Sequence, residues 1–289
     1  MTNTTGTAVG PARLARLALA ALAGAVTEAA GVTLTATAVW LICRAAQQPP
    51  LAALAVAVVA VRALAIGRGG FRYVERLVGH DTVLRVLAGL RGRLFDALVP
   101  LAPVGLPGLR RGDLVTNAVS DVDAVQDMLL RVAIPAFSVL VVGSASMTWA
   151  LVVLPSAAVA LAVGMIATGL VLPLAAAVRQ GRDGERLRSA KAELATTVVD
   201  LVEGLEDLLV NGATERFAQR NRAAAGAVAK LERRGATTQG LLEAGSILVQ
   251  LATTVVVGGL AIGSGRLDSV MVTVLVLVAL TTLETARPL

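Results

Sequence analysis

The chain has 289 residues, of which 56% are hydrophobic and only 16% charged, with a formal net charge of +6. A soluble domain is about 45–50% apolar and about 25% charged, so this composition disfavours a soluble enzyme, and it excludes disorder because disordered chains are poor in apolar residues. A single cysteine and a single histidine exclude a disulfide framework and a Cys-rich or His-rich metal site. The composition therefore favours a membrane protein.

Six apolar stretches are candidates for crossing a bilayer, which takes about 20 residues of helix. In chain order they are 17–43, 51–70, 132–154, 157–178, 241–262 and 270–289. Residues 1–16 precede the first stretch as a tail. We interpret the first stretch as an uncleaved span, because its apolar run is longer than the ~7–15 residues of a signal peptide.

The connections between these stretches alternate between short loops and two long excursions, 71–131 and 179–240. Most arginines and both lysines lie in the excursions or in the N-terminal tail, whereas the short loops hold only Arg44 and Arg266. Since Lys and Arg concentrate on the cytoplasmic side of membrane proteins, we expect both termini and both excursions to be cytoplasmic. The positive charge then reflects topology, and no nucleic-acid partner is expected.

Each excursion is predicted to consist of two helical legs around a breaker. The first breaker lies between Pro100 and Gly112, which is dense in proline and glycine, and the second is Asn211-Gly212. The second excursion also carries leucines seven residues apart, at Leu187, Leu194, Leu201 and Leu208, a spacing typical of helices packed on helices. We interpret the excursions either as rods that pass force from a cytoplasmic partner to the spans or as solvated coiled-coil loops.

Two ionisable residues, Glu28 and Arg62, fall within or near the apolar stretches. Such groups usually face a bundle interior or a water-filled path. They are candidates for lining a translocation path or for pairing with each other. The alternative is placement near an interface.

A second candidate site follows the end of the second stretch. Arg72, Arg76 and His80 are four residues apart and share one helix face, with Tyr73 close by. This set could bind an anionic thiol peptide, or His80 could ligate haem iron while the arginines meet the propionates. The alternative is a structural network in which Glu75 and Asp81 pair with neighbouring arginines.

Several short motifs carry a resemblance to a known family: Arg72-Tyr73-Val74-Glu75-Arg76 with His80-Asp81 and Arg85, Gly112-Asp113-Leu114, Asp121-Val122-Asp123, and Asp200-Leu201-Val202-Glu203-Gly204 with Gly212-Ala213. With six spans and two paired excursions, the chain resembles the transmembrane domain of a type IV ABC exporter. It is most similar to the CydC-type subunit of the heterodimeric thiol-reductant exporter tied to cytochrome bd assembly. The resemblance implies an all-α, six-helix transmembrane domain over residues 17–289, with long cytoplasmic helical extensions.

By this resemblance, the chain is a multi-pass protein of the cell inner membrane, surrounded by lipid, that pairs with a homologous CydD-type subunit and with ATPase domains. The implied substrates are small thiols such as cysteine and glutathione, with haem as a further ligand or cargo. The segments implied to dock on the ATPase are Leu106, Pro107, Leu109, Arg110 and Arg111, and Gly212, Ala213, Thr214, Glu215 and Arg216.

The sequence departs from the family pattern at Asn211, where a larger apolar residue is expected, and in containing no Gly-x-x-x-x-Gly-Lys-Ser/Thr loop. A P-loop needs its lysine to meet phosphate charge, and the two lysines, Lys191 and Lys230, lie in predicted helical legs. We therefore expect ATP and Mg²⁺ to bind at nucleotide-binding domains outside these residues, and we assign no catalytic residue or metal ligand here. The alternatives are a lipid, drug or haem exporter half, or a non-transporting remnant or scaffold.

Overall fold

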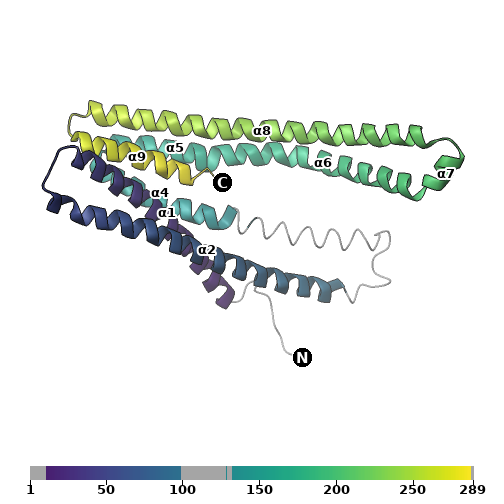
Figure 1. The fold of residues 1–289 in the computed structure, drawn as a ribbon, viewed down its shortest axis with the longest axis horizontal. Coiled ribbons are helices and arrows are strands. Elements are labelled where there is room, and N and C mark those ends of the chain that lie inside the picture. Colours follow the sequence, from purple (N-terminus) through teal and green to yellow (C-terminus); the bar gives the residue numbers. More distant parts are fainter. Residues whose placement is uncertain (1–10, 99–127, 129–131, 288–289) are drawn as a thin grey trace. The chain divides into compact units, whose positions relative to one another are not determined.

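The computed structural model describes residues 11–98, 128 and 132–287 (Figure 1). Every regular element in these residues is a helix, so the all-α class predicted from the sequence is confirmed. The helices are α1 (Pro11–Ala45), α2 (Leu51–Leu98), α4 (Ile134–Val153), α5 (Pro155–Ile166), the π-helical turn η3 (Ala167–Val171), α6 (Leu172–Glu203), α7 (Leu205–Val210), α8 (Thr214–Gly263) and α9 (Ser269–Thr285).

Five of the described helices are long and apolar enough to cross a membrane, and α9, with 17 residues, is a shorter apolar helix. The five apolar segments are Ala15–Ala45, Leu51–Arg93, Ile134–Val153, Pro155–Glu203 and Thr214–Gly263. At 1.5 Å per residue α9 is about 26 Å long, close to the ~30 Å of a hydrocarbon core. The chain is therefore a multi-pass membrane protein.

The chain divides into two compact units, one of residues 1–165 and 250–289 and one of residues 166–249. In the first unit, α1 packs along α2 and also contacts α4 and α9. α4 and α5 are separated at Leu154, whose backbone is extended because the following residue is Pro155. Asp268 begins α9 by accepting a hydrogen bond from the Ser269 backbone N–H at 2.8 Å.

Small and branched apolar side chains fill the core of this first unit. Its largest cluster joins α4, α5, the end of α8 and α9 through Ala150, Leu154, Ala157, Ala158, Leu161, Val257, Ala261, Leu275, Ala279 and Leu283. Polar contacts cross the same bundle, since the buried Thr282 hydroxyl donates to Ser146 Oγ at 2.9 Å and Gln250 donates to the Leu280 carbonyl at 2.9 Å. Small residues and interhelical hydrogen bonds of this kind hold helices together where lipid surrounds them.

The second unit is a helical hairpin built from α6, α7 and the first part of α8. Lys191 on α6 pairs with Glu232 on α8 at 2.9 Å, and Gly245 on α8 lies beside Leu172 on α6. The leucine seam was predicted to continue through one helix to Leu208, but the structure ends α6 at Glu203 and starts α7 at Leu205, with Gly204 outside helical geometry. The break predicted at Asn211-Gly212 is present, because α7 ends at Val210 and Gly212 has a φ of 63°.

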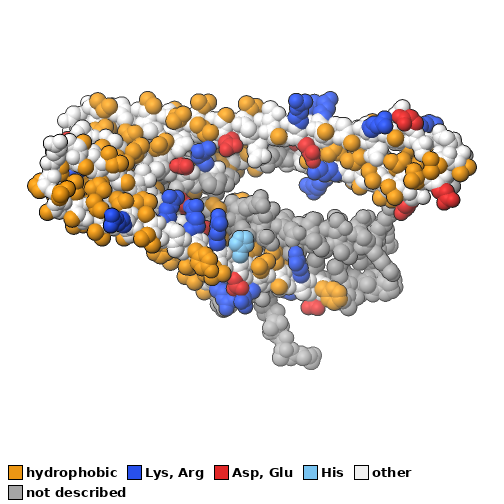
Figure 2. Space-filling view, viewed as in Figure 1, with side chains coloured by type: hydrophobic (Ala, Val, Ile, Leu, Met, Phe, Trp, Pro, Cys, Tyr) orange, Lys and Arg blue, Asp and Glu red, His pale blue; other side chains and the backbone are white. Residues whose placement is uncertain are grey.

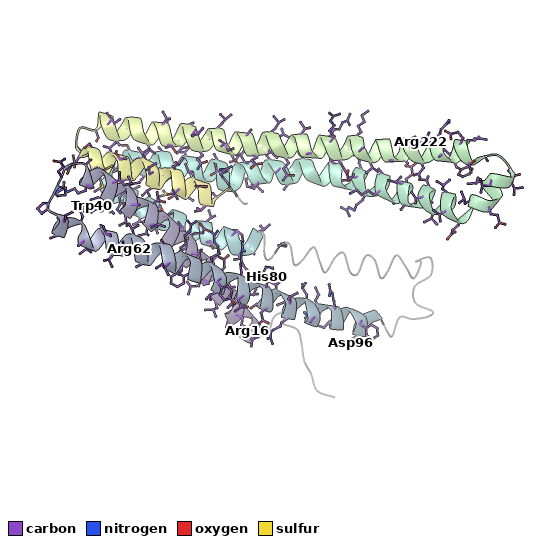
Figure 3. The ribbon with its side chains drawn as sticks, viewed as in Figure 1. Arg16, Trp40, Arg62, His80, Asp96 and Arg222 are labelled. Atoms are coloured by element: carbon purple, nitrogen blue, oxygen red, sulfur yellow. The ribbon has the colours of Figure 1, made fainter. Side chains whose placement is uncertain are left out.

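Figure 2 shows how side chains are distributed on α2, where basic residues gather along the helix before the single histidine, His80. Arg62 and His80 both lie on α2 (Figure 3), separated by 18 residues of sequence, which is about 27 Å of helix. Arg62 and His80 therefore lie at different levels of the same helix. Leu106, Pro107, Leu109, Arg110 and Arg111 lie outside the described residues.

Candidate functional site

The candidate site begins with matched faces on α1 and α2. On α1, Gly24, Glu28 and Gly31 follow one another at spacings of four and three residues, and so share a face. On α2, a single face with the same spacings carries Arg68, Arg72 and Glu75. Because a short turn joins the two helices, they run antiparallel and these two faces meet.

The contacts set the register of this pairing. Arg72 Nη2 lies 3.1 Å from Glu28 Oε1, and the two side chains are 46% and 29% exposed. A Cβ on Gly31 would lie 3.1 Å from the Arg68 guanidinium carbon, and one on Gly24 would lie 3.5 Å from Glu75 Oε1. The glycines therefore leave the room into which the charged side chains of α2 fit.

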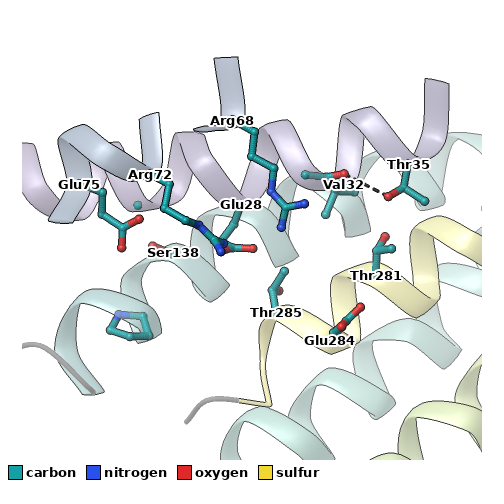
Figure 4. Close-up of a pocket in the computed structure, with 13 residues that line it drawn as sticks. Glu28, Val32, Thr35, Arg68, Arg72, Glu75, Ser138, Thr281, Glu284 and Thr285 are labelled. Carbon is teal, nitrogen blue, oxygen red and sulfur yellow. Dashed lines mark hydrogen bonds and ion pairs between the residues drawn. The ribbon is translucent and has the colours of Figure 1, made fainter. Parts of the chain in front are cut away.

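A polar cavity of about 460 Å³ lies beside this pairing (Figure 4). Its size falls within the roughly 300–1,000 Å³ of small-molecule sites. Four helices contribute its lining, which consists of Gly24, Glu28, Gly31, Val32 and Thr35 from α1, Arg68, Arg72 and Glu75 from α2, Pro135 and Ser138 from α4, and Thr281, Glu284 and Thr285 from α9. Figure 4 shows Arg68 and Arg72 entering from α2, and Thr281, Glu284 and Thr285 from α9.

The charges of the lining are mixed, with two arginines and three glutamates. Among the described residues, one ion pair is formed within the lining, between Arg72 and Glu28. Ionisable groups inside a membrane bundle are costly and are kept where they line a polar path or bind a ligand. This arrangement is suited to hold a small polar molecule that carries charges of both signs.

The structure brings only part of the predicted set together. Glu28 and Arg72 line the cavity, whereas Arg62 is exposed on α2 and is absent from the lining. The suggested pairing of Glu28 with Arg62 is wrong, because the carboxylate of Glu28 pairs with Arg72 instead. The physical reason is the antiparallel register, which places Arg72 opposite Glu28 and Arg62 several turns away.

Tyr73, Arg76 and His80 are exposed on α2 and line neither of the cavities described here. Next to them, Arg85 Nε lies 2.9 Å from Asp81 Oδ2, which is one of the pairs that a structural network would contain. The imidazole of His80 is thus open to a ligand from outside the chain. Haem ligation by His80 stays a prediction.

Sequence reasoning did not single out Arg68, Glu75, Ser138 or the α9 residues Thr281, Glu284 and Thr285 as site residues. The helical spacing of α2 could have identified two of them, because Arg68 and Glu75 share a helix face with Arg72. That face lies opposite the glycines of α1. For Ser138 and the α9 residues there was no such signal, since only the packing of α4 and α9 against α1 brings them to the cavity.

Two further features are relevant to function. A more apolar cavity of about 300 Å³ is lined by residues of α1, α4 and α9, including Ala36, Val142, Trp149 and Val278. In the second unit, Gly212 and Ala213 form the turn before α8, and Thr214, Glu215 and Arg216 begin that helix. Glu215 forms an ion pair with Arg222 at 3.2 Å, and both side chains are exposed.

Similarity to known proteins indicates the family to which the chain belongs. No protein-family model matches the chain. The chain is 30% identical over 201 residues, which are 67% of this chain and 34% of the relative, to the glutathione/L-cysteine transport system ATP-binding/permease protein CydD of Bacillus subtilis. It is 31% identical over 160 residues to the CydC protein of the same system in Haemophilus influenzae, covering 55% of this chain and 28% of that protein.

A third relative is the CydC protein of Escherichia coli, to which the chain is 34% identical over 161 residues, covering 54% of this chain and 27% of that protein. The chain thus spans about a third or less of the length of the curated relatives it matches. The resemblance to a CydC-type ABC exporter transmembrane domain is confirmed by these similarities and by the all-helical fold.

Proposed function

We propose that this CydC-type transmembrane domain is the membrane-spanning half of an ATP-driven exporter that moves small thiols, such as cysteine and glutathione, out of the cytoplasm in support of cytochrome bd assembly. The observation that carries the proposal is the charged cavity of about 460 Å³ within an apolar helix bundle. Its support is the similarity to glutathione/L-cysteine transport proteins, together with the rule that ionisable groups in membrane spans mark substrate paths.

The energy source in this proposal lies outside these residues. The sequence has no P-loop, so ATP and Mg²⁺ would bind nucleotide-binding domains that are not among these 289 residues. Force would reach the spans through the hairpin of α6, α7 and α8, with Gly212 to Arg216 as its docking segment, and through the segment around Leu106 to Arg111. Helices that continue from a span without interruption, as α8 does over 50 residues, suit this role because they move as rods.

The partner in this proposal is a homologous CydD-type subunit, and the two chains together would enclose the path. Both termini are proposed to be cytoplasmic, in an inner membrane, because the arginine-rich excursions would lie on the same side. In this orientation the polar cavity lies toward the cytoplasmic ends of the spans, where an exporter takes up its cargo.

Transport into inverted membrane vesicles tests the proposal. We expect ATP-dependent uptake of radiolabelled cysteine or glutathione into vesicles that contain this chain with its partner, and a loss of uptake in Arg72→Gln, whose guanidinium lines the cavity. The matched control is Arg44→Gln, an exposed arginine at the end of α1 that is outside both cavities. Vesicles that hydrolyse ATP but take up neither thiol would overturn the thiol assignment.

A second candidate is a lipid or drug exporter half. The apolar cavity lined by Ala36, Val142, Trp149 and Val278 favours it, because such a cavity suits an acyl chain or an apolar drug. In that case Ala36→Trp, which fills this cavity, would abolish transport while Arg72→Gln would leave it intact. The thiol proposal expects the opposite pattern.

A further inference from the structure

Three charged side chains of the cavity, Arg68, Glu75 and Glu284, form no ion pair with another described residue. Arg68 on α2 is half-buried with its guanidinium over Gly31, and no ion pair or side-chain hydrogen bond joins it to another described residue. Glu284 on α9 likewise has no ion pair to another described residue. Both line the same cavity, and Figure 4 shows Arg68 extending from α2 and Glu284 from α9.

The wall formed by α9 is rich in hydrogen-bond acceptors. Thr281 donates its hydroxyl proton to the Leu277 carbonyl at 2.9 Å, and Thr285 donates to the Thr282 carbonyl at 2.7 Å. Their oxygens therefore offer free lone pairs to the cavity, next to the Glu284 carboxylate. This wall also lies at the C-terminal end of α9, where the helix dipole favours a cation.

The wall formed by α2 carries two arginines as well as the carboxylate of Glu75. Arg68 presents only N–H donors, in a planar fork that matches a carboxylate through two parallel hydrogen bonds. Arg72, its neighbour one turn along, is already engaged by Glu28 at 3.1 Å. The cavity thus has an anion-binding guanidinium, that of Arg68, on α2 and a cation-binding wall on α9.

From this polarity we infer that the cavity binds the α-amino-acid head group of its ligand, with Arg68 pairing with the carboxylate and Glu284 with the ammonium. The inference rests on the proposed function and deepens it, since it names the part of the substrate that is recognised. A simple dianion is disfavoured by three glutamates in the lining, and a simple cation by two arginines. A zwitterion carries the two charges that Arg68 and Glu284 complement.

The lining of the cavity also determines whether the sulfhydryl group of the ligand is recognised. Among the described residues that line the cavity there is no cysteine, methionine, histidine or aromatic side chain that would distinguish sulfur from oxygen. Binding is therefore selective for the amino-acid head group and indifferent to the sulfhydryl. L-serine should occupy the cavity nearly as well as L-cysteine, whereas a thiol without one of the two charges should not.

The test is a calorimetric titration of the protein in lipid nanodiscs, together with the subunits that co-purify with it. The four probes are L-cysteine, L-serine, cysteamine, which lacks the carboxylate, and 3-mercaptopropionate, which lacks the ammonium. We expect the two amino acids to bind within about threefold of each other and the two single-charge thiols to bind about tenfold or more weakly, because each forfeits one charge-assisted pair.

Substitutions at Arg68 and Glu284 test which residue binds the carboxylate of the ligand and which binds its ammonium group. Arg68→Gln should weaken the binding of L-cysteine about tenfold and change the affinity for cysteamine by no more than about twofold. Cysteamine has no carboxylate, so it makes no pair with Arg68 that the substitution could remove. Glu284→Gln should weaken the binding of L-cysteine by a similar factor and leave the affinity for 3-mercaptopropionate unchanged. Arg68→Lys should recover part of the affinity, which separates loss of a charge from misfolding. The matched controls are Arg44→Gln and Glu193→Gln, both exposed and outside the cavity.

The inference is overturned if L-serine fails to bind where L-cysteine binds, or if Arg68→Gln and Glu284→Gln weaken all four probes equally or none. Its failure is distinguishable from that of the proposed function. ATP-driven thiol transport that is unaffected by Arg68→Gln and Glu284→Gln contradicts the inference alone. Head-group binding with the expected variant pattern, but without thiol transport, contradicts the proposed function alone.

Discussion

The carboxylate of Glu28 on α1 pairs with the guanidinium of Arg72 on α2 at 3.1 Å, across 44 residues of sequence. This pair lies in the polar cavity and reflects the register of the first two helices. Facing residues in this hairpin have numbers that add up to about 100, as in Gly31 with Arg68 and Leu17 with Val83. One short turn near residue 50 therefore determines which charges meet.

A double-mutant cycle on this pair is the first prediction. Glu28→Gln and Arg72→Gln should each lower the free energy of unfolding, and the double variant should lose less than the sum, with a coupling of about 1 kcal/mol. The reason is that each single variant leaves the opposite charge unpaired in a half-buried position. The free energy of unfolding is measured by denaturant titration in detergent micelles. The control cycle of Glu28→Gln with Arg62→Gln should be additive, and coupling there instead would contradict the register.

The second prediction concerns Gly31, which faces Arg68. A Cβ at Gly31 would lie 3.1 Å from the guanidinium carbon, so Gly31→Ala should shift Arg68 slightly and Gly31→Leu should displace it from the cavity. We expect L-cysteine affinity to fall about tenfold in Gly31→Leu, because the carboxylate partner is moved. Titration calorimetry measures it. Gly69→Leu is the matched control, since nothing lies within 4 Å of a Cβ there, and equal losses in both variants would rule out the close approach as the cause.

Gly212, in the turn between α7 and α8, is the subject of the third prediction. Its φ of 63° lies in the left-handed region, which costs a residue with a Cβ about 1–2 kcal/mol. Gly212→Val should distort the proposed docking segment, so that ATP-driven transport falls while L-cysteine binding in the first unit is unchanged. Gly212→Asn should retain transport, because asparagine tolerates this conformation.

Vesicle uptake and titration calorimetry, run on the same preparations, separate the two effects in Gly212→Val. Gly226→Val is the matched control, since Gly226 lies within α8 and nothing is within 4 Å of a Cβ there. Wild-type transport by Gly212→Val would show that this turn does not transmit force.

The fourth prediction tests haem ligation at His80. The imidazole is exposed on α2, so an axial bond to haem iron is sterically open. If this is the ligand, His80→Ala should lower haem affinity about tenfold or more and change the Soret spectrum, because the iron loses its nitrogen ligand. Absorbance titration of haem into the nanodisc complex measures both. Arg76→Gln should lower haem affinity less than His80→Ala does and leave the Soret spectrum unchanged. Unaltered haem binding by His80→Ala would assign the histidine to a structural role.

Much of the fold could be predicted before any packing was known. The apolar stretches, the break at Gly212 and the long helical legs each depend on residues close together in the chain, so hydropathy and helix-stop signals are enough to find them. The break at Gly204 was not predicted, because Leu201 and Leu208 keep the heptad spacing across it. The leucine spacing predicted a continuous helix, whereas the backbone is interrupted at Gly204.

The candidate site was predictable only in part. Glu28 and Arg72 stand out as charges within or just beyond apolar stretches, but a charge alone does not say which partner it meets. Arg62 was as plausible a partner for Glu28 by depth, and the structure decides against it through the turn near residue 50. Glu284 lies near the end of the last apolar stretch, and only the packing of α9 against α1 places it on the cavity wall.

By itself, the sequence determined that this is an all-helical membrane protein with its basic residues gathered in two excursions, because burial of apolar residues and placement of charge are properties of each segment alone. Only the tertiary structure decided which charged residues share a cavity and which remain unpaired there. The reason is physical: a helix presents each side chain at a fixed angle, but the partner of that side chain depends on the register and rotation of the neighbouring helices. Arg68 and Glu284 are 216 residues apart in the chain and meet at one cavity because α2 and α9 both pack against α1.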